Sequence, residues 1–323
     1  MKRILSIRQG AIGDVIVTLP TIALLRDAYP DAYIEVIGNE QTLKLAVGVG
    51  YADKARAGER ALTTEMYKPN ARLSDETVRY FSGFDIVLAY MKDKGDVIED
   101  NITKCGAGRV IKIPPFPKGE GIHAADYSAT ILNPLGIAPI SLLPPLIPRV
   151  NTTPEDRAFA TEYLERQRNR EPLVALHPRT WGEKAWPMEG FIEIAQWVRD
   201  GLKGTPVWII GPVEEESEPS LTEAVPEAIT VRVESLRRLA SILALCDIYL
   251  GCDTGISHLA AASGVPTAAL FGATDPRVWA PRGDCAVFVL KADTVTAIDT
   301  QTVKGALTEL YKTRNKVVKI IDV

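Results

Sequence analysis

The chain has 323 residues, of which 46% are hydrophobic and 24% charged, and its formal net charge is −4. This length and composition are typical of a globular protein of about two domains. Nucleic-acid-binding proteins carry basic surfaces, so the weak negative charge argues against that class. We expect no membrane-spanning helix, because no run of 18 apolar residues is present. We also expect no signal peptide, because a short apolar strand directly follows Met1.

The four cysteines, Cys105, Cys246, Cys252 and Cys285, show no CxxC spacing, which argues against a zinc site. Cys246 and Cys252 flank one apolar run, and we expect both to be buried small hydrophobic residues. Unpaired thiols are typical of a reducing compartment. The composition therefore predicts a cytoplasmic protein.

Strands and helices alternate in the first half of the chain. The apolar runs predict strands at residues 3–8, 33–37, 84–90 and 109–113. The periodic segments predict helices at residues 14–28, after Glu40, at 96–104 and at 124–135. Residues 139–154 are dense in proline, which leaves little room for regular structure and predicts a linker between domains.

The second half repeats this alternation. We expect strands at residues 173–176, 206–210, 248–251 and 267–271, and an extended segment at 315–323. Helices are expected at residues 188–201, 236–245 and 256–263. Strands joined by helices of this length form parallel sheets with right-handed crossovers. The chain is therefore predicted to be an α/β protein with two Rossmann-like domains, residues 1–150 and 151–323. The carboxyl ends of both sheets are expected to face a central cleft.

The first motif is IRQGAIGD at residues 7–14, a glycine-rich turn between a strand and a helix. Its glycines are three apart, so it does not match the GxGxxG pattern of dinucleotide-binding proteins. Gly10 and Gly13 let another molecule approach the backbone closely. Asp14 stands at the start of the helix, where it is either a capping residue or a general base that takes a proton from an attacking hydroxyl.

The second motif is LHPRTWGEKAWP at residues 176–187, between a strand and a helix. Arg179, Thr180 and Lys184 are three groups that bind anions, and they lie within six residues of each other. They indicate a phosphate site at the end of this strand. The alternative for Lys184 is an ordinary solvated lysine in a loop.

The third motif, LGCDTGISHLAAASGVPTAALFGATDP, begins at residue 250 and turns from a buried strand into a helix at Asp253, Thr254 and Gly255. The amino end of a helix presents free N–H groups and partial positive charge, which suits a phosphate. His258 lies on the first turn of this helix. Asp253 and Thr254 are otherwise ordinary N-caps. The DTG triplet also occurs in aspartic proteases, but those are all-β proteins, which the α/β alternation excludes.

Together these segments resemble glycosyltransferase family 9, the ADP-heptose:lipopolysaccharide heptosyltransferases. The resemblance rests on RQGAIGDVIVTLPTIALLRDAYP, HPRTWGEKAWP, GPVEEE and GCDTGISHLAAASGVPTAALFGATDP, and it covers nearly the whole chain. It implies a GT-B fold, in which the first domain binds the acceptor and the second binds the nucleotide sugar. It also implies inversion at the anomeric carbon without a metal ion. No cofactor is implied, because the ADP-sugar is a substrate.

The resemblance also implies roles for single residues. Asp14 is the implied general base, and Lys184 and Thr180 would hold the diphosphate. Glu214 or Glu216 would meet the ribose hydroxyls. The main chain near Ser235 and Leu236 would pass the adenine. The groups that would line the donor phosphates and the heptose are Asp253, Thr254, Gly255 and His258.

The chain departs from the family at Arg179, where relatives often have a glycine, so Arg179 either adds phosphate charge or changes which donor fits. A basic loop in the first half contains Arg56, Arg60, Lys68 and Arg72. This loop either is a solvated surface or binds acidic sugars and lipid phosphates of the acceptor. His123 opens a helix and is a further candidate for acceptor binding.

The implied reaction moves a heptose from ADP-heptose to the inner core of lipopolysaccharide. The acceptor would be a lipid-linked saccharide, so we expect a cytoplasmic enzyme with peripheral contact at the inner face of the inner membrane, and no nucleic-acid partner. No DxD-like acidic pair is placed to hold a metal. The alternatives are a family 9 transferase with another nucleotide sugar or acceptor, a GT-B-like epimerase and a non-catalytic nucleotide binder.

Overall fold

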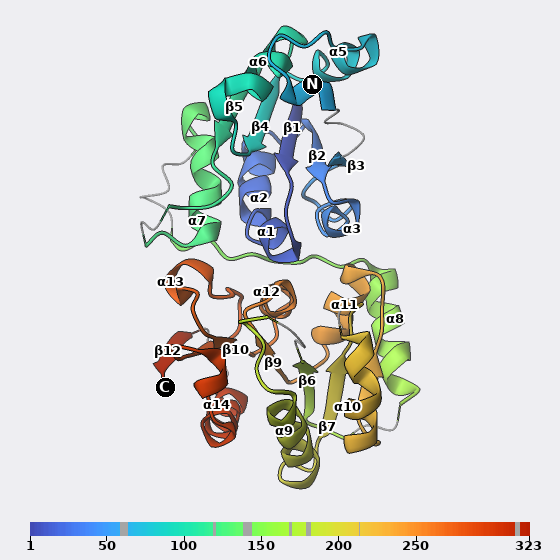
Figure 1. The fold of residues 1–323 in the computed structure, drawn as a ribbon. Helices are drawn as coiled ribbons and strands as arrows, with labels where there is room; N and C mark the ends of the chain where they lie inside the picture. Colours follow the sequence, from blue (N-terminus) through green and yellow to red (C-terminus); the bar gives the residue numbers. More distant parts are fainter. Residues whose placement is uncertain are drawn as a thin grey trace. The chain divides into compact units, whose positions relative to one another are not determined.

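The computed structural model describes residues 1–58, 64–118, 121–137, 144–167, 170–178, 182–212, 214–313 and 317–323. The chain divides into two compact units, Met1–Pro148 and Arg149–Val323, each built around its own sheet (Figure 1). The bonds of the main chain explain where the division falls. The N–H of Leu146 donates to Asp126 of the first unit at 2.9 Å, whereas the N–H of Val150 donates to the carbonyl of Ala262 in the second at 2.8 Å.

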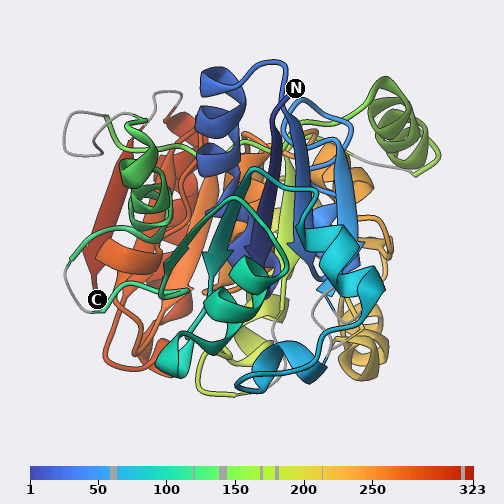
Figure 2. The same cartoon turned by 90° about the horizontal axis from the view of Figure 1, so that it is seen from above.

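The sheet of the first unit has five parallel strands in the order β3-β2-β1-β4-β5. Their bounds are β1 Arg3–Arg8, β2 Tyr33–Gly38, β3 Lys54–Ala57, β4 Ile86–Tyr90 and β5 Arg109–Ile113. In Figure 2 the dark blue β1 lies between the blue β2 and the teal β4. Chain order reverses direction between β1 and β4, and this is where open α/β sheets bind ligands, at the carboxyl ends of the strands.

The helices of the first unit are shorter than the sequence predicts. They are α1 Ile12–Ile16, α2 Leu19–Ala28, α3 Glu40–Leu43, α5 Asp75–Phe81, α6 Val97–Lys104 and α7 Ala124–Ala129, with 3-10 turns η1 Thr64–Tyr67, η2 Lys94–Asp96 and η3 Thr130–Leu135. The single helix expected at residues 14–28 is broken because Pro20 has no N–H to donate and the Thr18 hydroxyl bonds the carbonyl of Asp14 at 2.8 Å. The helix expected at 124–135 continues from α7 as the 3-10 turn η3, which contains Pro134.

A buried carboxylate ties β2 to β3 and α5. Glu35 is 2% exposed and accepts hydrogen bonds from Tyr80 at 2.7 Å, Tyr33 at 2.8 Å and Arg56 at 3.2 Å. The guanidinium of Arg56 also lies over the Tyr80 ring, 4.3 Å from its centre. Burial alone would raise the pKa of the Glu35 carboxyl, but the three hydrogen bonds outweigh it and hold the pKa below its ordinary range.

We expect Glu35→Gln to lower the stability of the first unit by about 1–3 kcal/mol at neutral pH, because the amide cannot satisfy all three donors. The folded-state pKa of Glu35 is depressed, so its contribution is present above about pH 4.3, its unfolded value, and is lost as pH falls through the folded value. Urea unfolding from pH 7 to pH 3 should therefore show the gap between wild type and variant closing in acid. The exposed Glu76→Gln, in the same unit, is the control, and a gap that stays constant with pH would contradict this account.

The sheet of the second unit has seven parallel strands in the order β12-β11-β10-β9-β6-β7-β8. They are β6 Leu173–His177, β7 Thr205–Ile209, β8 Ile229–Val231, β9 Ile248–Cys252, β10 Thr267–Phe271, β11 Val287–Lys291 and β12 Val318–Asp322. The helices are α8 Pro154–Glu165, α9 Met188–Asp200, α10 Glu218–Ala224, α11 Leu236–Leu243, α12 Gly255–Ala262, α13 Pro276–Trp279 and α14 Thr300–Lys312, with 3-10 turns η5 Glu215–Ser217 and η6 Val295–Ala297. From the neighbouring pair β6 and β9, the following strands continue outward on one side as β7 and β8 and on the other side as β10, β11 and β12. The order of the strands along the chain therefore reverses between β6 and β9.

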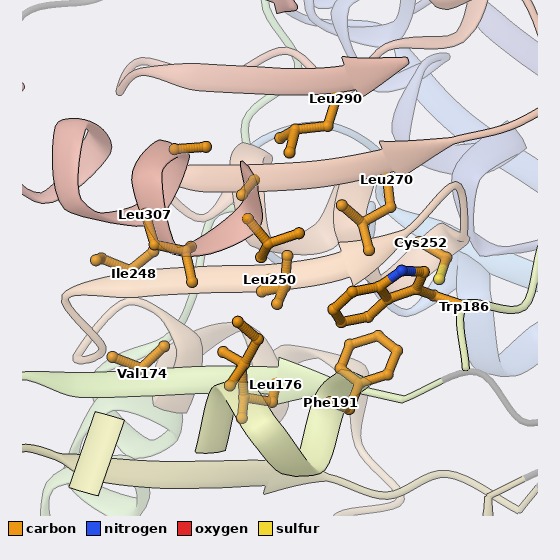
Figure 3. Packing of buried hydrophobic residues seen from close by; sticks show 14 of the residues in the cluster. Val174, Leu176, Trp186, Phe191, Ile248, Leu250, Cys252, Leu270, Leu290 and Leu307 are labelled. Carbon is orange, nitrogen blue, oxygen red and sulfur yellow. The ribbon is translucent and has the colours of Figure 1, made fainter. Parts of the chain in front are cut away.

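The main core of the second unit lies between one face of this sheet and the helices α9, α10 and α14. Figure 3 shows the indole ring of Trp186 beside Cys252 and next to Phe191. The two rings meet edge to face, with centres 5.1 Å apart. Helix α14 belongs to this unit, since Lys304 donates to Glu193 of α9 at 2.7 Å. The sequence alone does not indicate which unit this last helix joins.

The expected burial of Cys246 and Cys252 is confirmed. Among the residues that the structure describes, no helix combines the length and the hydropathy that a membrane crossing requires.

Candidate functional site

In the first unit, Asp14 lies on the first turn of α1, just past the carboxyl end of β1. It is not the N-cap, which is Ala11; instead its Oδ2 atom accepts the N–H of Ala11 at 2.8 Å. A side chain at Gly10 would overlap this carboxylate, with its Cβ 2.7 Å from the Cβ of Asp14. Gly10 therefore makes room for Asp14. The carboxylate keeps 15% of its side-chain surface exposed, so a solvent molecule or a ligand can reach it.

In the second unit, Lys184 and Asp253 meet although 69 residues separate them in sequence. Lys184 follows β6 and Asp253 follows β9, and these strands are neighbours where chain order reverses. The ammonium of Lys184 bonds the carboxylate of Asp253, which also accepts the Thr274 hydroxyl at 2.7 Å. Lys184 is thus not a freely solvated lysine, although its side chain is 40% exposed, and Asp253 is not an N-cap.

The loop that presents Lys184 is fixed by the core beneath it. Trp186 is 3% exposed, and its indole N–H donates to the carbonyl of Ile298 at 2.8 Å. Lys184 stands only two residues before this anchor, so its position follows from the packing of the tryptophan. The pattern KxW in the second motif therefore combines a partly exposed charge with a buried ring.

The turn from β9 into α12 is held from below by buried hydroxyl groups. Tyr249 and Ser257 share a hydrogen bond of 3.1 Å, and Ser257 donates to the carbonyl of Cys252 at 2.5 Å. A side chain at Gly251 would overlap the Tyr249 hydroxyl, which explains the glycine. Thr254 is the N-cap residue of α12 but its side chain makes no capping bond. Among the described residues no acceptor bonds the first N–H groups of α12, an arrangement that suits a phosphate.

Glu214 lies beyond the carboxyl end of β7 and is buried. Its Oε2 atom accepts the N–H of Gly211 at 3.0 Å, and its Oε1 atom lies 3.8 Å from Nε2 of His177, the last residue of β6. Burial alone would raise the pKa of the Glu214 carboxyl, but His177 and the Gly211 N–H outweigh it, so the pKa lies below its ordinary range. Glu214 is therefore an ionised carboxylate at the carboxyl end of this sheet.

Glu216, the other acidic residue predicted to meet the donor, is exposed. It lines a cavity of about 390 Å³ together with residues 185–188, Ser217, Ser220 and Thr296. This cavity adjoins Lys184 through Ala185. Three hydroxyl groups and one carboxylate share this concave surface with the apolar side chains of residues 185–188, a mixture that suits a ligand with polar and apolar parts.

A protein family model matches this chain. The model of glycosyltransferase family 9 (heptosyltransferase) covers residues 143–305, just over half of the sequence. The chain belongs to glycosyltransferase family 9. Lipopolysaccharide heptosyltransferase 1 of Pseudomonas aeruginosa is 37% identical over 106 residues, which are 32% of this chain and 29% of that protein. The family 9 chain thus matches less than a third of that relative's length.

Solved structures resemble this family 9 protein over nearly its whole length. The alignment with the family 9 glycosyl transferase of Veillonella parvula has a TM-score of 0.78 at 20% identity. It covers 96% of this chain and 97% of the Veillonella chain. The alignment with the E. coli ADP-heptose lps heptosyltransferase II has a TM-score of 0.74 at 18% identity. It covers 97% of this chain and 99% of the E. coli chain. At such identities the likeness shows the fold, and the predicted α/β GT-B fold is confirmed.

Several residues predicted for this family 9 site have other partners in the structure. Arg56 bonds the buried Glu35, as described above. His123 is buried, and its Nδ1 atom caps α7 by accepting the N–H of Ala125 at 3.2 Å. Arg72 is exposed in the loop before α5. Their roles in binding an acceptor remain predictions.

The remaining predicted residues of this family 9 protein lie as follows. His258 is buried on the first turns of α12, and Gly255 begins that helix. Leu236 is the first residue of α11, directly after the N-cap Ser235, and it is partly exposed. Gly13 lies within α1. The three predicted residues that lie outside the described residues are Arg60, Arg179 and Thr180.

The described residues contain one cluster of three carboxylates close enough to share a cation, Asp93, Asp96 and Glu99. The ammonium of Lys112 bonds all three and already supplies the positive charge. Burial alone would lower the pKa of Lys112, but the three carboxylates outweigh it and raise that pKa. The cluster in this family 9 protein is therefore a salt-bridge network of the first unit.

Sequence reasoning missed Thr274 and His177, which contact the predicted site residues Asp253 and Glu214. Thr274 belongs to the GATDP segment that supports the resemblance, but its bond to Asp253 depends on the adjacency of β9 and β10. His177 lies in the second motif, and its contact with Glu214 depends on the adjacency of β6 and β7. Both contacts join residues that are distant in sequence, so no local pattern indicates them.

Proposed function

We propose that this family 9 protein transfers a heptose from ADP-heptose to the inner core of lipopolysaccharide, with inversion and without a metal ion. The observation that best supports the proposal is the pairing of Lys184 and Asp253 beside the free N–H groups of α12. That arrangement lies where the chain order of the sheet reverses, which suits a nucleotide diphosphate. The names of the P. aeruginosa relative and of the E. coli structure support a heptosyl donor and a lipopolysaccharide acceptor.

The leaving group of this reaction is ADP. As the bond between the sugar and the diphosphate breaks, negative charge grows on the phosphate and positive charge on the sugar. The ammonium of Lys184 and the N–H groups at the start of α12 would stabilise the phosphate charge without a metal. Glu214 would accept hydrogen bonds from the ribose hydroxyls. Asp253 would accept hydrogen bonds from hydroxyl groups of the heptose.

The attacking group is a hydroxyl of the acceptor. In the proposed reaction Asp14 takes its proton, because it is a carboxylate in contact with solvent at the end of β1. Attack from the side opposite the leaving diphosphate then inverts the anomeric carbon. No cofactor takes part, since the ADP-sugar is consumed as a substrate. We propose a lipid-linked saccharide acceptor at the inner face of the inner membrane.

Titration calorimetry with ADP-heptose, ADP-glucose, UDP-GlcNAc and ADP tests the donor assignment. We expect ADP-heptose and ADP to bind and the UDP-sugar to bind weakly. Turnover of ADP-heptose with a lipopolysaccharide-core acceptor should be unchanged in EDTA. Preference for a UDP-sugar would overturn the heptosyl donor but keep a family 9 transferase. Loss of turnover in EDTA, restored by a divalent ion, would overturn the metal-independent mechanism.

A further inference from the structure

Arg8, the last residue of β1, lies directly behind the carboxylate of Asp14. Its Nη2 atom is 3.5 Å from Oδ1 of Asp14, and its Nε atom donates to the main-chain carbonyl of Asp14 at 3.3 Å. The Arg8 side chain is 3% exposed, against 15% for Asp14. A ligand can therefore reach the carboxylate, whereas the guanidinium contacts Asp14 from the protein interior.

The guanidinium of Arg8 is itself fixed on several sides. Its Nη1 atom donates to the carbonyl of Pro115 at 2.9 Å. Its Cζ atom lies over the rings of Tyr90 and Phe116, whose centres are 5.2 and 5.4 Å away. A planar fork held in this way has few alternative orientations. The bonds from Arg8 therefore restrict both the backbone and the carboxylate of Asp14.

Burying a guanidinium costs free energy, and apolar residues of similar volume often serve stability equally well. Burial lowers the pKa of the Arg8 guanidinium, and the neighbouring carboxylate of Asp14 opposes this shift. Arginine nevertheless stays protonated in proteins. A buried charge whose only carboxylate partner within the described residues is the candidate base points to a role in the site rather than in the core.

We infer that Arg8 is a positioning residue, which holds the Asp14 carboxylate in the orientation that removes the acceptor proton. The inference rests on the proposed function, in which Asp14 is the general base. The Ala11 N–H bonds the second carboxylate oxygen of Asp14, Oδ2. Without Arg8 the carboxylate would lose one of its two anchors.

The test compares kcat, the KM for each substrate and ADP binding in Arg8→Met, Arg8→Lys and Asp14→Asn. We expect Arg8→Met to lower kcat about ten- to a hundredfold, the cost of a misplaced catalytic group, with the affinity for ADP unchanged. Arg8→Lys keeps the positive charge but loses the planar guanidinium, so its kcat should lie between those of wild type and Arg8→Met. In the Asp14→Asn background, Arg8→Met should cause no further loss, since Arg8 acts through Asp14. The exposed Arg79→Met is the matched control, and thermal unfolding monitors the fold.

The outcomes separate this inference from the proposed function. Full turnover in Asp14→Asn would refute Asp14 as the base, and with it the proposed mechanism. Loss of turnover in Asp14→Asn with wild-type kcat in Arg8→Met would refute only the role of Arg8. A raised KM for the acceptor at unchanged kcat would likewise overturn it, because Arg8 would then bind the acceptor. Should Arg8→Met fail to fold, Arg8→Lys decides, and wild-type kcat in that variant would overturn the inference.

Discussion

Asp14→Asn should lower kcat by about a hundred- to ten-thousandfold, the range that general-base catalysis contributes. The amide cannot take a proton, but it has the same size and still accepts the N–H of Ala11, so the turn after β1 stays intact. The affinity for ADP should not change, because the groups that would hold the diphosphate belong to the second unit. Steady-state turnover and ADP calorimetry on the same preparation check both expectations.

The control for this change is Asp27→Asn, which alters an exposed carboxylate on α2 in the same unit. It should retain wild-type turnover. A pH profile adds a second check, since the limb of kcat/KM that reports an essential base should disappear in Asp14→Asn. If the variant kept that limb, the base would be another group.

Lys184→Ala should weaken ADP binding by about ten- to a hundredfold. The variant loses a positive charge that would face the diphosphate, and it also leaves the Asp253 carboxylate, 8% exposed, without its partner next to the phosphates. Truncating one member of a buried charge pair costs about 2–5 kcal/mol in well-studied interfaces. The free-energy cost should be lower for Lys184, because this side chain is 40% exposed and solvent screens its charge.

Two further variants separate the causes. Lys184→Ala combined with Asp253→Asn removes the uncompensated negative charge, so it should bind ADP more tightly than Lys184→Ala alone. The control Lys312→Ala removes an exposed charge at the end of α14 and should leave binding unchanged. Equal affinities for the single and double variants would mean that Asp253 does not repel the diphosphate.

Much of the fold was predictable because buried parallel strands are continuous apolar runs. The strand expected at residues 267–271 is observed there as β10, and the α/β alternation led to the confirmed fold class. Of the missed strands, β3 and β8 lack such runs, whereas β11, with the sequence VFVLK, is an apolar run that the prediction left out. β3 has the sequence KARA, and it is held by the contact of Arg56 with Glu35 on the neighbouring strand rather than by its own composition. β8 has only three residues.

One missed helix did carry a local signal. Thr153 caps α8, Pro154 takes its first position, and Asp156 bonds back to Thr153, which is a capping box. The neighbouring prolines led to the prediction of a linker that extended through residue 154. A proline at the first position of a helix is distinguished from a proline in an irregular linker by the residues after it. In this chain Pro154 is succeeded by two acidic residues, which favour the first turn of a helix.

The candidate site was predicted as a set of residues but not as a set of contacts. Glycines and anion-binding groups at strand ends indicated Asp14, Lys184 and Asp253 from local chemistry. The bond between Lys184 and Asp253 depends on the order of the strands, which the sequence does not state. The same holds for Arg56, whose charge suggested a ligand but whose partner is the buried Glu35.

The hydrogen bonds of Glu35 also bear on how this fold can change during evolution. A slip of β3 by one residue would turn Arg56 to the opposite face of the sheet and break its bond with Glu35. The register of this short strand is thus set by a bond inside the unit. Substitutions at the other residues of β3 can therefore accumulate without displacing the strand, as long as Arg56 and Glu35 are kept.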